Sequence, residues 1–145
     1  MEELLAVNGF QASGVAAGLK KNGKKDLGLL YSMVPSAVAG VFTRNLVQAA
    51  PVILDRERVK SGHCRAIVVN SGNANCCTGK RGMVDALAMA KSVADRLGQP
   101  EVDVLVASTG VIGEPLPIHK VVAAVPDLVT ALRTDGLTDL AQAIM

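Results

Sequence analysis

The clearest pattern of apolar and polar positions is a strand–helix–strand unit between residues 66 and 107. The run 66–69 is apolar and rich in β-branched residues, which is typical of a buried strand. Over 83–97, apolar residues recur at steps of three and four and predict an amphipathic helix, which Gly98 ends. The apolar stretch 102–107 then predicts a second buried strand.

The amino-terminal third of the chain predicts further strands. Residues 9–18 are rich in Gly, Ala and Ser, which favours an extended strand with close backbone approaches. The basic cluster 20–25 contains an Asn-Gly pair and predicts a solvated turn between two strands. We expect buried strands at 27–34 and 37–43, separated at Pro35.

The carboxy-terminal third predicts helices. Pro115 and Pro117 bracket a turn, after which the stretches 119–125, 127–133 and 137–145 each suit a helix. No shift in composition marks a boundary, so we expect a single domain. The fold class predicted is α/β, a mixed β-sheet with outer helices.

The two strands of the central unit should be parallel, because a helical crossover returns the chain in the same direction. The Gly-bearing loops 70–79 and 108–113 would then emerge together at the carboxyl ends of their strands. Ligands bind at that end of open α/β sheets. The pattern therefore predicts that these two loops line one crevice.

The second loop suits recognition of a negative oxygen. Thr109 supplies a hydroxyl donor, Gly110 can adopt a positive φ, and small residues let main-chain amides of a turn beginning at residue 109 approach a ligand. The same pattern fits an oxyanion hole, a phosphate nest or an ordinary turn. The string 110–113 is no P-loop, because no Gly-Lys-Ser or Gly-Lys-Thr follows it.

Composition excludes several classes of protein. The 145 residues are 50% hydrophobic and 19% charged, which excludes intrinsic disorder. A net charge of +2 and an aromatic content of 2% argue against a nucleic-acid binder. The apolar blocks are too short to span a membrane, and the acidic start at residues 1–5 lacks the basic region of a signal peptide. We expect a soluble cytoplasmic protein with no nucleic-acid or membrane partner.

The cysteines and histidines suggest no metal site. The sequence neighbours Cys76 and Cys77 could bond only through a strained ring, and Cys64 stands alone, so a disulfide framework is not expected. His63 beside Cys64 gives two ligands, which do not make a zinc centre. His119 is expected on the surface, and neither histidine has a Ser or Asp partner at a known catalytic spacing.

At the two loops the sequence resembles the bifunctional ornithine acetyltransferase / N-acetylglutamate synthase family of arginine biosynthesis. The resemblance is carried by Asn70-Ser71-Gly72-Asn73-Ala74-Asn75 with Thr78-Gly79, and by Ser108-Thr109-Gly110-Val111-Ile112-Gly113 with Leu116-Pro117. Supporting stretches are Gly9-Phe10, Gly14-Val15-Ala16-Ala17-Gly18, Phe42-Thr43 with Asn45, and Ala49-Ala50-Pro51-Val52. Two departures are Cys76, where the family has a small Ala, and Arg44, where it has Thr.

The resemblance implies a glutamate N-acetyltransferase that moves acetyl from N-acetylornithine to glutamate through an acyl-enzyme. Some members also use acetyl-CoA as a donor, and no other cofactor is implied. Family precursors cut themselves into two chains, and the new amino-terminal Thr of the second chain is the nucleophile, its α-amine serving as base. The oxyanion hole maps to Thr109 and Gly110 here. The family's layered αββα arrangement and its hetero-oligomer of paired chains are implied likewise.

By this resemblance, residues 1–145 are the amino-terminal segment of a longer acetyltransferase precursor. The string 143–145 resembles the residues just before a Thr-Thr-Asp segment of the family, and the nucleophilic Thr lies beyond it. We expect the chain alone to be inactive, to expose apolar faces and to need the carboxy-terminal chain of the precursor. The alternative is a non-catalytic module that binds an anionic metabolite through its glycine loops.

Overall fold

The computed structural model describes residues 6–145, so the acidic start of the chain lies outside the described part. Its centre is a four-stranded sheet of order β1-β2-β3-β4. The strands are β1 (Phe10–Val15), β2 (Leu27–Ala37), β3 (His63–Asn73) and β4 (Val104–Val111). β2 pairs antiparallel with both β1 and β3, whereas β3 and β4 are parallel. The predicted α/β class with a mixed sheet is confirmed.

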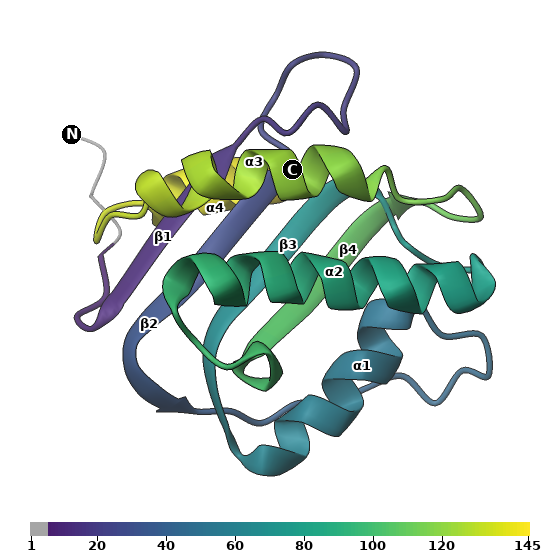
Figure 1. The fold of residues 1–145 in the computed structure, drawn as a ribbon, viewed down its shortest axis with the longest axis horizontal. Helices are drawn as coiled ribbons and strands as arrows, with labels where there is room; N and C mark the ends of the chain where they lie inside the picture. The colour runs from purple at the N-terminus through teal and green to yellow at the C-terminus, as the bar shows by residue number, and fades with distance from the viewer. Residues whose placement is uncertain (1–5) are drawn as a thin grey trace.

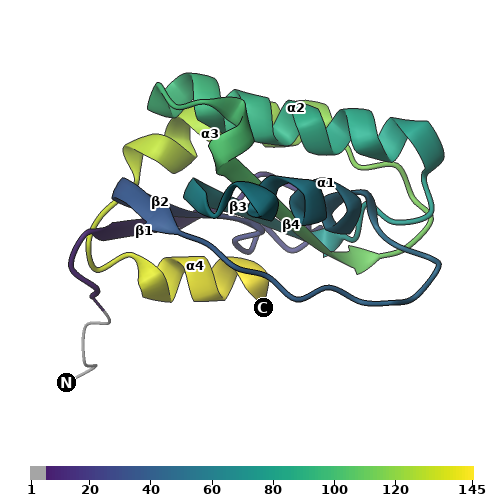
Figure 2. The same cartoon turned by 90° about the horizontal axis from the view of Figure 1, so that it is seen from below.

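Helices lie on both faces of the sheet and along one of its edges. α2 (Gly79–Leu97) and α3 (Ile118–Thr130) cover one face, and α4 (Leu137–Ile144) lies on the other, as Figures 1 and 2 show. α1 (Ala50–Arg58) runs beside the outer strand β4. Short 3-10 turns precede β3 and β4. None of the helices in residues 6–145 combines the length and apolarity that a membrane crossing requires.

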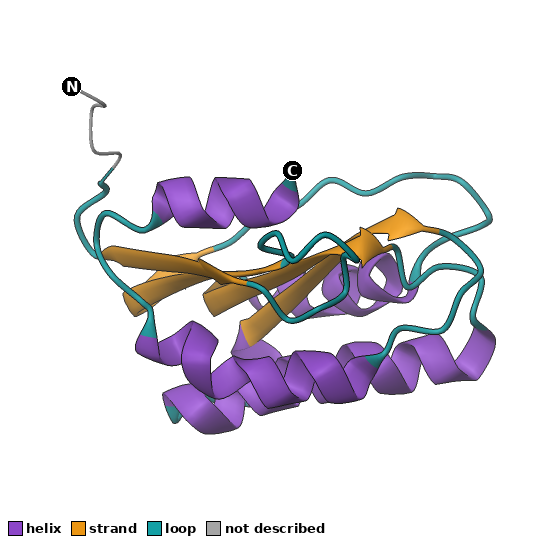
Figure 3. Ribbon diagram, turned by 90° about the horizontal axis from the view of Figure 1, so that it is seen from above, coloured by secondary structure: helices purple, strands orange, loops and turns teal. Residues whose placement is uncertain are grey.

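The central strand–helix–strand unit is confirmed. α2 starts one turn earlier than the sequence predicts and ends at Gly98, whose φ of 65° forms the left-handed cap. Its apolar face packs on the sheet, where Met89 and Val93 of the helix and Val68 and Val106 of the strands are 0–1% exposed. This burial holds β3 and β4 together as a parallel pair. Figure 3 shows the sheet in orange with helices on both of its faces.

The predicted strand at 37–43 is wrong. β2 instead runs through Pro35, which falls in an irregular stretch between Tyr31 and Ser36 where a missing N–H costs no ladder bond. The segment 38–49 that follows is mostly exposed, and Val41 is fully so. It packs on a helix rather than on the sheet, because the Arg56 guanidinium of α1 stacks over the Phe42 ring at 5.6 Å.

The helix boundaries also differ from the prediction. α1 was not predicted, although Pro51 at its start is a typical first-turn residue. The two helices expected at 119–125 and 127–133 are one helix, α3, which accommodates Pro126 in its interior. The loop expected to begin at residue 70 is strand as far as Asn73, because β4 continues beside it.

Side chains of α1 bond main-chain groups along the amino-terminal half of the β4 edge. An edge strand has main-chain groups with no strand to bond. Here the Arg58 guanidinium donates to the carbonyl of Val104 and, at 2.6 Å, to the carboxylate of Glu101. The Asp55 carboxylate accepts the Val106 N–H at 3.1 Å. A helix therefore takes the place of a fifth strand along this half of β4.

α4 approaches the opposite face closely because two glycines pair beneath it. Gly14 of β1 lies opposite Gly28 of β2. A Cβ at Gly14 would lie 2.2 Å from the main-chain oxygen of Asp139, whereas one at Gly28 would meet the flexible end of Leu140 at 2.5 Å. The paired glycines therefore let the backbone of α4 lie directly on the sheet.

Alanine at these two glycines should destabilise the fold unequally. Gly14→Ala pushes against main chain and should cost near the upper end of roughly 1–3 kcal/mol, whereas Gly28→Ala can be absorbed by Leu140 and should cost near the lower end. Urea unfolding of both variants measures the difference through the transition midpoint. Equal costs, or a larger cost at Gly28, would contradict this packing of α4.

Burial of Asp55 should make the stability of the fold depend on pH. Desolvation, partly offset by the bond from Val106 and the charge of Arg58, raises the pKa of Asp55 from 3.8 to about 6. The folded state then binds more protons than the unfolded state, so stability falls as pH rises from about 4 to about 6.

The variant Asp55→Asn keeps an acceptor oxygen for the Val106 N–H and removes the titrating charge. Relative to wild type, its free energy of unfolding should rise by about 1–2 kcal/mol as the pH increases across that interval. Urea unfolding at each pH measures this difference. The variant Asp127→Asn, at an exposed carboxylate on α3, serves as control and should run parallel to wild type. If the difference in free energy of unfolding between wild type and Asp55→Asn did not change with pH, the role assigned to Asp55 would be refuted.

Candidate functional site

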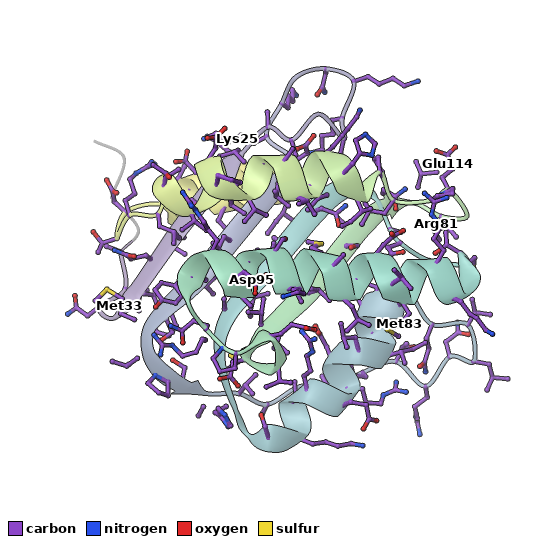
Figure 4. The ribbon with its side chains drawn as sticks, viewed as in Figure 1. Lys25, Met33, Arg81, Met83, Asp95 and Glu114 are labelled. Carbon is purple, nitrogen blue, oxygen red and sulfur yellow. The ribbon has the colours of Figure 1, made fainter. Side chains whose placement is uncertain are left out.

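The ends of β3 and β4 bring together the two segments that the sequence predicts to converge. The Ala74 N–H donates to the carbonyl of Val111 at 2.9 Å, and the Gly113 N–H donates to the carbonyl of Cys76 at 2.9 Å. The Asn73 side-chain amide donates to the carbonyl of Glu114 at 3.0 Å. Figure 4 places Glu114, which follows β4, at the same end of the molecule as Arg81 at the start of α2. The two segments meet as predicted, but the cavities of about 350 and 200 Å³ beside them are each lined by residues of only one segment.

Thr109 and Gly110 lie in a strand and not in the turn that the sequence predicts. They are in β4, paired in register with Ser71 and Gly72, and both are exposed. The strand continues this far because β3 continues beside it. At the point where the turn was expected, the Ser108 hydroxyl instead donates to the Asn70 side chain at 2.6 Å. The direction of the main-chain N–H groups of Thr109 and Gly110 is therefore set by strand geometry.

Main-chain N–H groups of a strand point alternately to its two sides, so neighbouring residues of β4 face different ways. The Val106 N–H points outward, to Asp55 on α1. The Val111 carbonyl points inward, to Ala74 beyond the end of β3. The same alternation directs the Thr109 N–H inward, into the pairing with β3, and the Gly110 N–H outward. One main-chain donor, from Gly110, is therefore directed to the outer edge of the sheet, one residue after exposed Thr109.

Only glycine fits at position 110. Its φ is 134°, a conformation that side chains rarely adopt. A Cβ there would lie 2.4 Å from the carbonyl carbon of Gly72 and 2.5 Å from the nitrogen of Asn73. Both obstacles are main chain, so they cannot move aside. Gly110 adopts a positive φ, as the sequence allows, at a point where the two strand ends approach closely.

A third segment, which sequence reasoning did not connect to the site, lies against the end of β3. Asp26 is fully buried, and its carboxylate accepts the main-chain N–H groups of Ala17, Leu19 and Lys20 at 2.6, 2.6 and 2.8 Å. The loop folded around it places Leu19 and Lys20 within 3.6 Å of the position that a Cβ of Gly72 would occupy. The one sequence feature that pointed to this loop is Asp26 itself, an acidic residue directly after the basic cluster 20–25.

A cavity of about 200 Å³ follows the outer edge of β4 toward Thr109. Its lining combines the end of the 38–49 segment, the start of α1 and the middle of β4. The residues are Phe42, Ala49, Pro51, Val52, Asp55, Val106, Ala107 and Ser108. Its walls are largely apolar, and Asp55 is its acidic group.

The histidines take no part in this arrangement. His119 is exposed at the start of α3, as the sequence predicts, and exposed His63 has its Nε2 3.3 Å from Asp103. Within residues 6–145 no three His, Cys, Asp or Glu side chains are grouped so that they could hold a metal ion.

Comparison with known proteins gives consistent matches. A model of the ArgJ family matches residues 11–145. The Arginine biosynthesis bifunctional protein ArgJ of Geobacter sulfurreducens is 55% identical over 139 residues, which cover 96% of this chain and 35% of that protein. The protein of the same name from Caldanaerobacter subterraneus is 56% identical over 137 residues, 94% of this chain and 34% of that protein.

Solved structures agree with these matches. Ornithine acetyltransferase from Mycobacterium tuberculosis, solved in complex with ornithine, superposes with a TM-score of 0.92 at 43% identity, covering 95% of this chain and 76% of that one. ArgJ from Bacillus halodurans gives a TM-score of 0.88 at 41% identity, over 94% of this chain and 72% of that one. The chain spans 35% of the length of the Geobacter relative. A family match across residues 11–145 and this fold show that the chain belongs to the ArgJ family.

Proposed function

We propose that this chain is the part of a glutamate N-acetyltransferase that supplies the oxyanion hole. In the proposed reaction, acetyl moves from N-acetylornithine to glutamate through an acyl-enzyme formed on a Thr outside this chain. Support comes from the family match, from the name of the M. tuberculosis neighbour and from the resemblance in the segments around Gly72 and Gly110. The proposal also includes acetyl-CoA as a second acetyl donor. It further includes assembly of this chain with a carboxy-terminal chain into a hetero-oligomer.

The observation that carries the proposal is the position of Thr109 and Gly110, both exposed, on the edge strand β4, where alternation directs the Gly110 N–H outward. When a nucleophile attacks the acetyl carbonyl, negative charge builds on its oxygen, and donors at 2.7–3.1 Å stabilise that charge. The Gly110 amide and the Thr109 hydroxyl are two such donors on one strand. The rigid contact of Gly110 with Gly72 fixes the main-chain donor before the reaction begins.

The two donors would act in both halves of the reaction. In the first, attack by the Thr hydroxyl on N-acetylornithine gives a tetrahedral oxyanion, which collapses to acyl-enzyme and releases ornithine. In the second, the amine of glutamate attacks the acyl-enzyme through a similar oxyanion, whose collapse breaks the ester bond, releases N-acetylglutamate and restores the Thr hydroxyl. The cavity beside Phe42, Asp55 and Ser108 lies along the same edge of β4 and would lie next to the reacting acetyl group.

The first test concerns which part of the protein is needed. The purified 145-residue chain should give no acetyl transfer from N-acetylornithine to glutamate, because the proposal assigns the nucleophile to a Thr outside it. A chimera in which this chain replaces the matching segment of the Geobacter relative should be active, measured by formation of N-acetylglutamate. Turnover by the chain alone, or a folded but inactive chimera, would contradict the proposal.

The second test concerns Thr109 in the same chimera. Thr109→Ala removes one oxyanion donor and should lower kcat by roughly 10²–10³. Thr109→Ser keeps the hydroxyl and should recover most of that loss. Thr134→Ala, at an exposed Thr in the turn between α3 and α4, is the matched control and should leave kcat unchanged. A Thr109→Ala variant as active as the control, or a Ser variant as poor as the Ala variant, would count against the assignment.

A further inference from the structure

Two adjacent thiols lie between the end of β3 and the start of α2. The Sγ atoms of Cys76 and Cys77 are 3.8 Å apart, and the peptide bond between the residues is trans. Cys76 is half-buried and Cys77 is exposed. The third cysteine, Cys64, is buried at 8% exposure and lies on β3, before the strand residues that lead to this site.

The backbone around the thiols is held in an unusual conformation. Asn75 and Cys77 have φ of 47° and 60°, in the left-handed region that residues other than glycine seldom adopt. Asn75 is fixed on both sides: its main-chain N–H donates to the Asn73 side chain at 2.8 Å, and its side-chain amide donates to the carbonyl of Gly82 at 2.8 Å. The dithiol therefore lies on a short strained segment next to a rigid asparagine.

We propose that Cys76 and Cys77 form a vicinal dithiol site that is oxidised reversibly by low-molecular-weight disulfides of the glutathione type. The Cys77 side chain is accessible to such an oxidant, because it lines an open cavity of about 350 Å³ together with Thr78, Lys80 and Met83. Burial, followed by the hydrogen bond with Cys77, raises the pKa of the Cys76 thiol.

The chemistry balances in two exchange steps. The Cys77 thiolate attacks one sulfur of the oxidant; the new bond joins Cys77 to that sulfur, the bond within the oxidant breaks, and one small thiol is released. Cys76 then loses its proton to solvent and attacks the Cys77 sulfur, forming the vicinal disulfide and releasing the second small thiol. Two protein thiols are oxidised, and one small disulfide is reduced to two thiols.

Such a bond should be easily reversed. Consecutive Cα atoms are about 3.8 Å apart across a trans peptide, which is shorter than the roughly 4.4–6.8 Å between the Cα atoms of ordinary disulfides. Closing the ring therefore strains the Cys76–Cys77 peptide, and strained, exposed disulfides are readily reduced. A dithiol reductant should restore the thiols.

Oxidation should also move the segment that follows β4. The carbonyl of Cys76 accepts the Gly113 N–H at 2.9 Å, and this carbonyl belongs to the peptide that must twist when the ring closes. Loss of that bond would free the turn after Val111, next to Gly110. The dithiol and the end of β4 are thereby coupled through one hydrogen bond.

Trypsin provides a direct test, because cleavage after Arg65 and Lys80 isolates residues 66–80 with both thiols and without Cys64. The 145-residue chain is incubated with excess oxidised glutathione, quenched with N-ethylmaleimide, digested and weighed by mass spectrometry. Peptide 66–80 should lose the mass of two hydrogens and carry no glutathione, and dithiothreitol should reverse the change. The variant Cys76→Ala should instead keep a stable glutathione adduct on Cys77.

A wild-type peptide that stays reduced, or that keeps a stable adduct as the Cys76→Ala variant does, would overturn the proposed site. Hydrogen exchange tests the coupling: the Gly113 amide should exchange at least about tenfold faster in the oxidised chain, as expected when an amide loses its bond partner. In Cys76→Ala the same treatment should leave that rate unchanged. Bridge formation without faster exchange at Gly113 would refute the coupling.

Discussion

The candidate site depends on a difference between the two halves of the β4 edge: side chains of α1 bond the main chain of one half and not of the other. Along the amino-terminal half, Arg58 and Asp55 of α1 bond the carbonyl of Val104 and the N–H of Val106, so the edge is closed by side chains. Beyond that point the strand continues, and its alternation directs the Gly110 N–H outward. A helix placed one turn further along would have occupied this donor too. The position of α1 therefore sets which part of the β4 edge is left without side-chain partners from this helix.

The second constraint is the close contact of two strand ends. Gly110 approaches Gly72 so closely that any side chain at 110 would meet main chain. Asn73 and the adjacent main chain then hold the residues after β4 through bonds from the Asn73 side chain and the Ala74 N–H. Segments far apart in the sequence are thus joined at this strand end, and in the proposed function this contact would position the donors before a ligand arrives. The Asp26 loop borders the same strand end through Leu19 and Lys20.

Sequence pattern was sufficient for the parts of the fold that rest on apolar periodicity. The parallel pair β3 and β4 with α2 between them follows from buried apolar runs, and Gly98 marks the end of the helix. Strand ends were predicted poorly, because Asn, Ser and Gly at 70–73 and 108–110 are turn formers by local preference. Tertiary pairing overrode that preference here, since each strand supplies the partner that the other needs.

The candidate site could be located from the sequence but its surroundings could not. Two Gly-bearing segments at the ends of parallel strands point to one edge of the sheet, and Thr109 and Gly110 lie there. The roles of Asp55 and Asp26 depend on a helix and a loop that pack from elsewhere, and neither has a local motif. Apolar residues at 41–42 looked like a strand, yet they form part of an exposed segment held by Arg56.

Hydrogen exchange at single amides of β4 tests the central claim most directly. If alternation directs the Gly110 N–H to the open edge, this amide should exchange rapidly in the folded chain, whereas Thr109, paired with β3, and Val106, bonded to Asp55, should be protected. Nuclear magnetic resonance resolves the three amides separately. Protection of Gly110 equal to that of Thr109 would mean that its N–H is already bonded within the protein, and the proposed oxyanion donor would not exist.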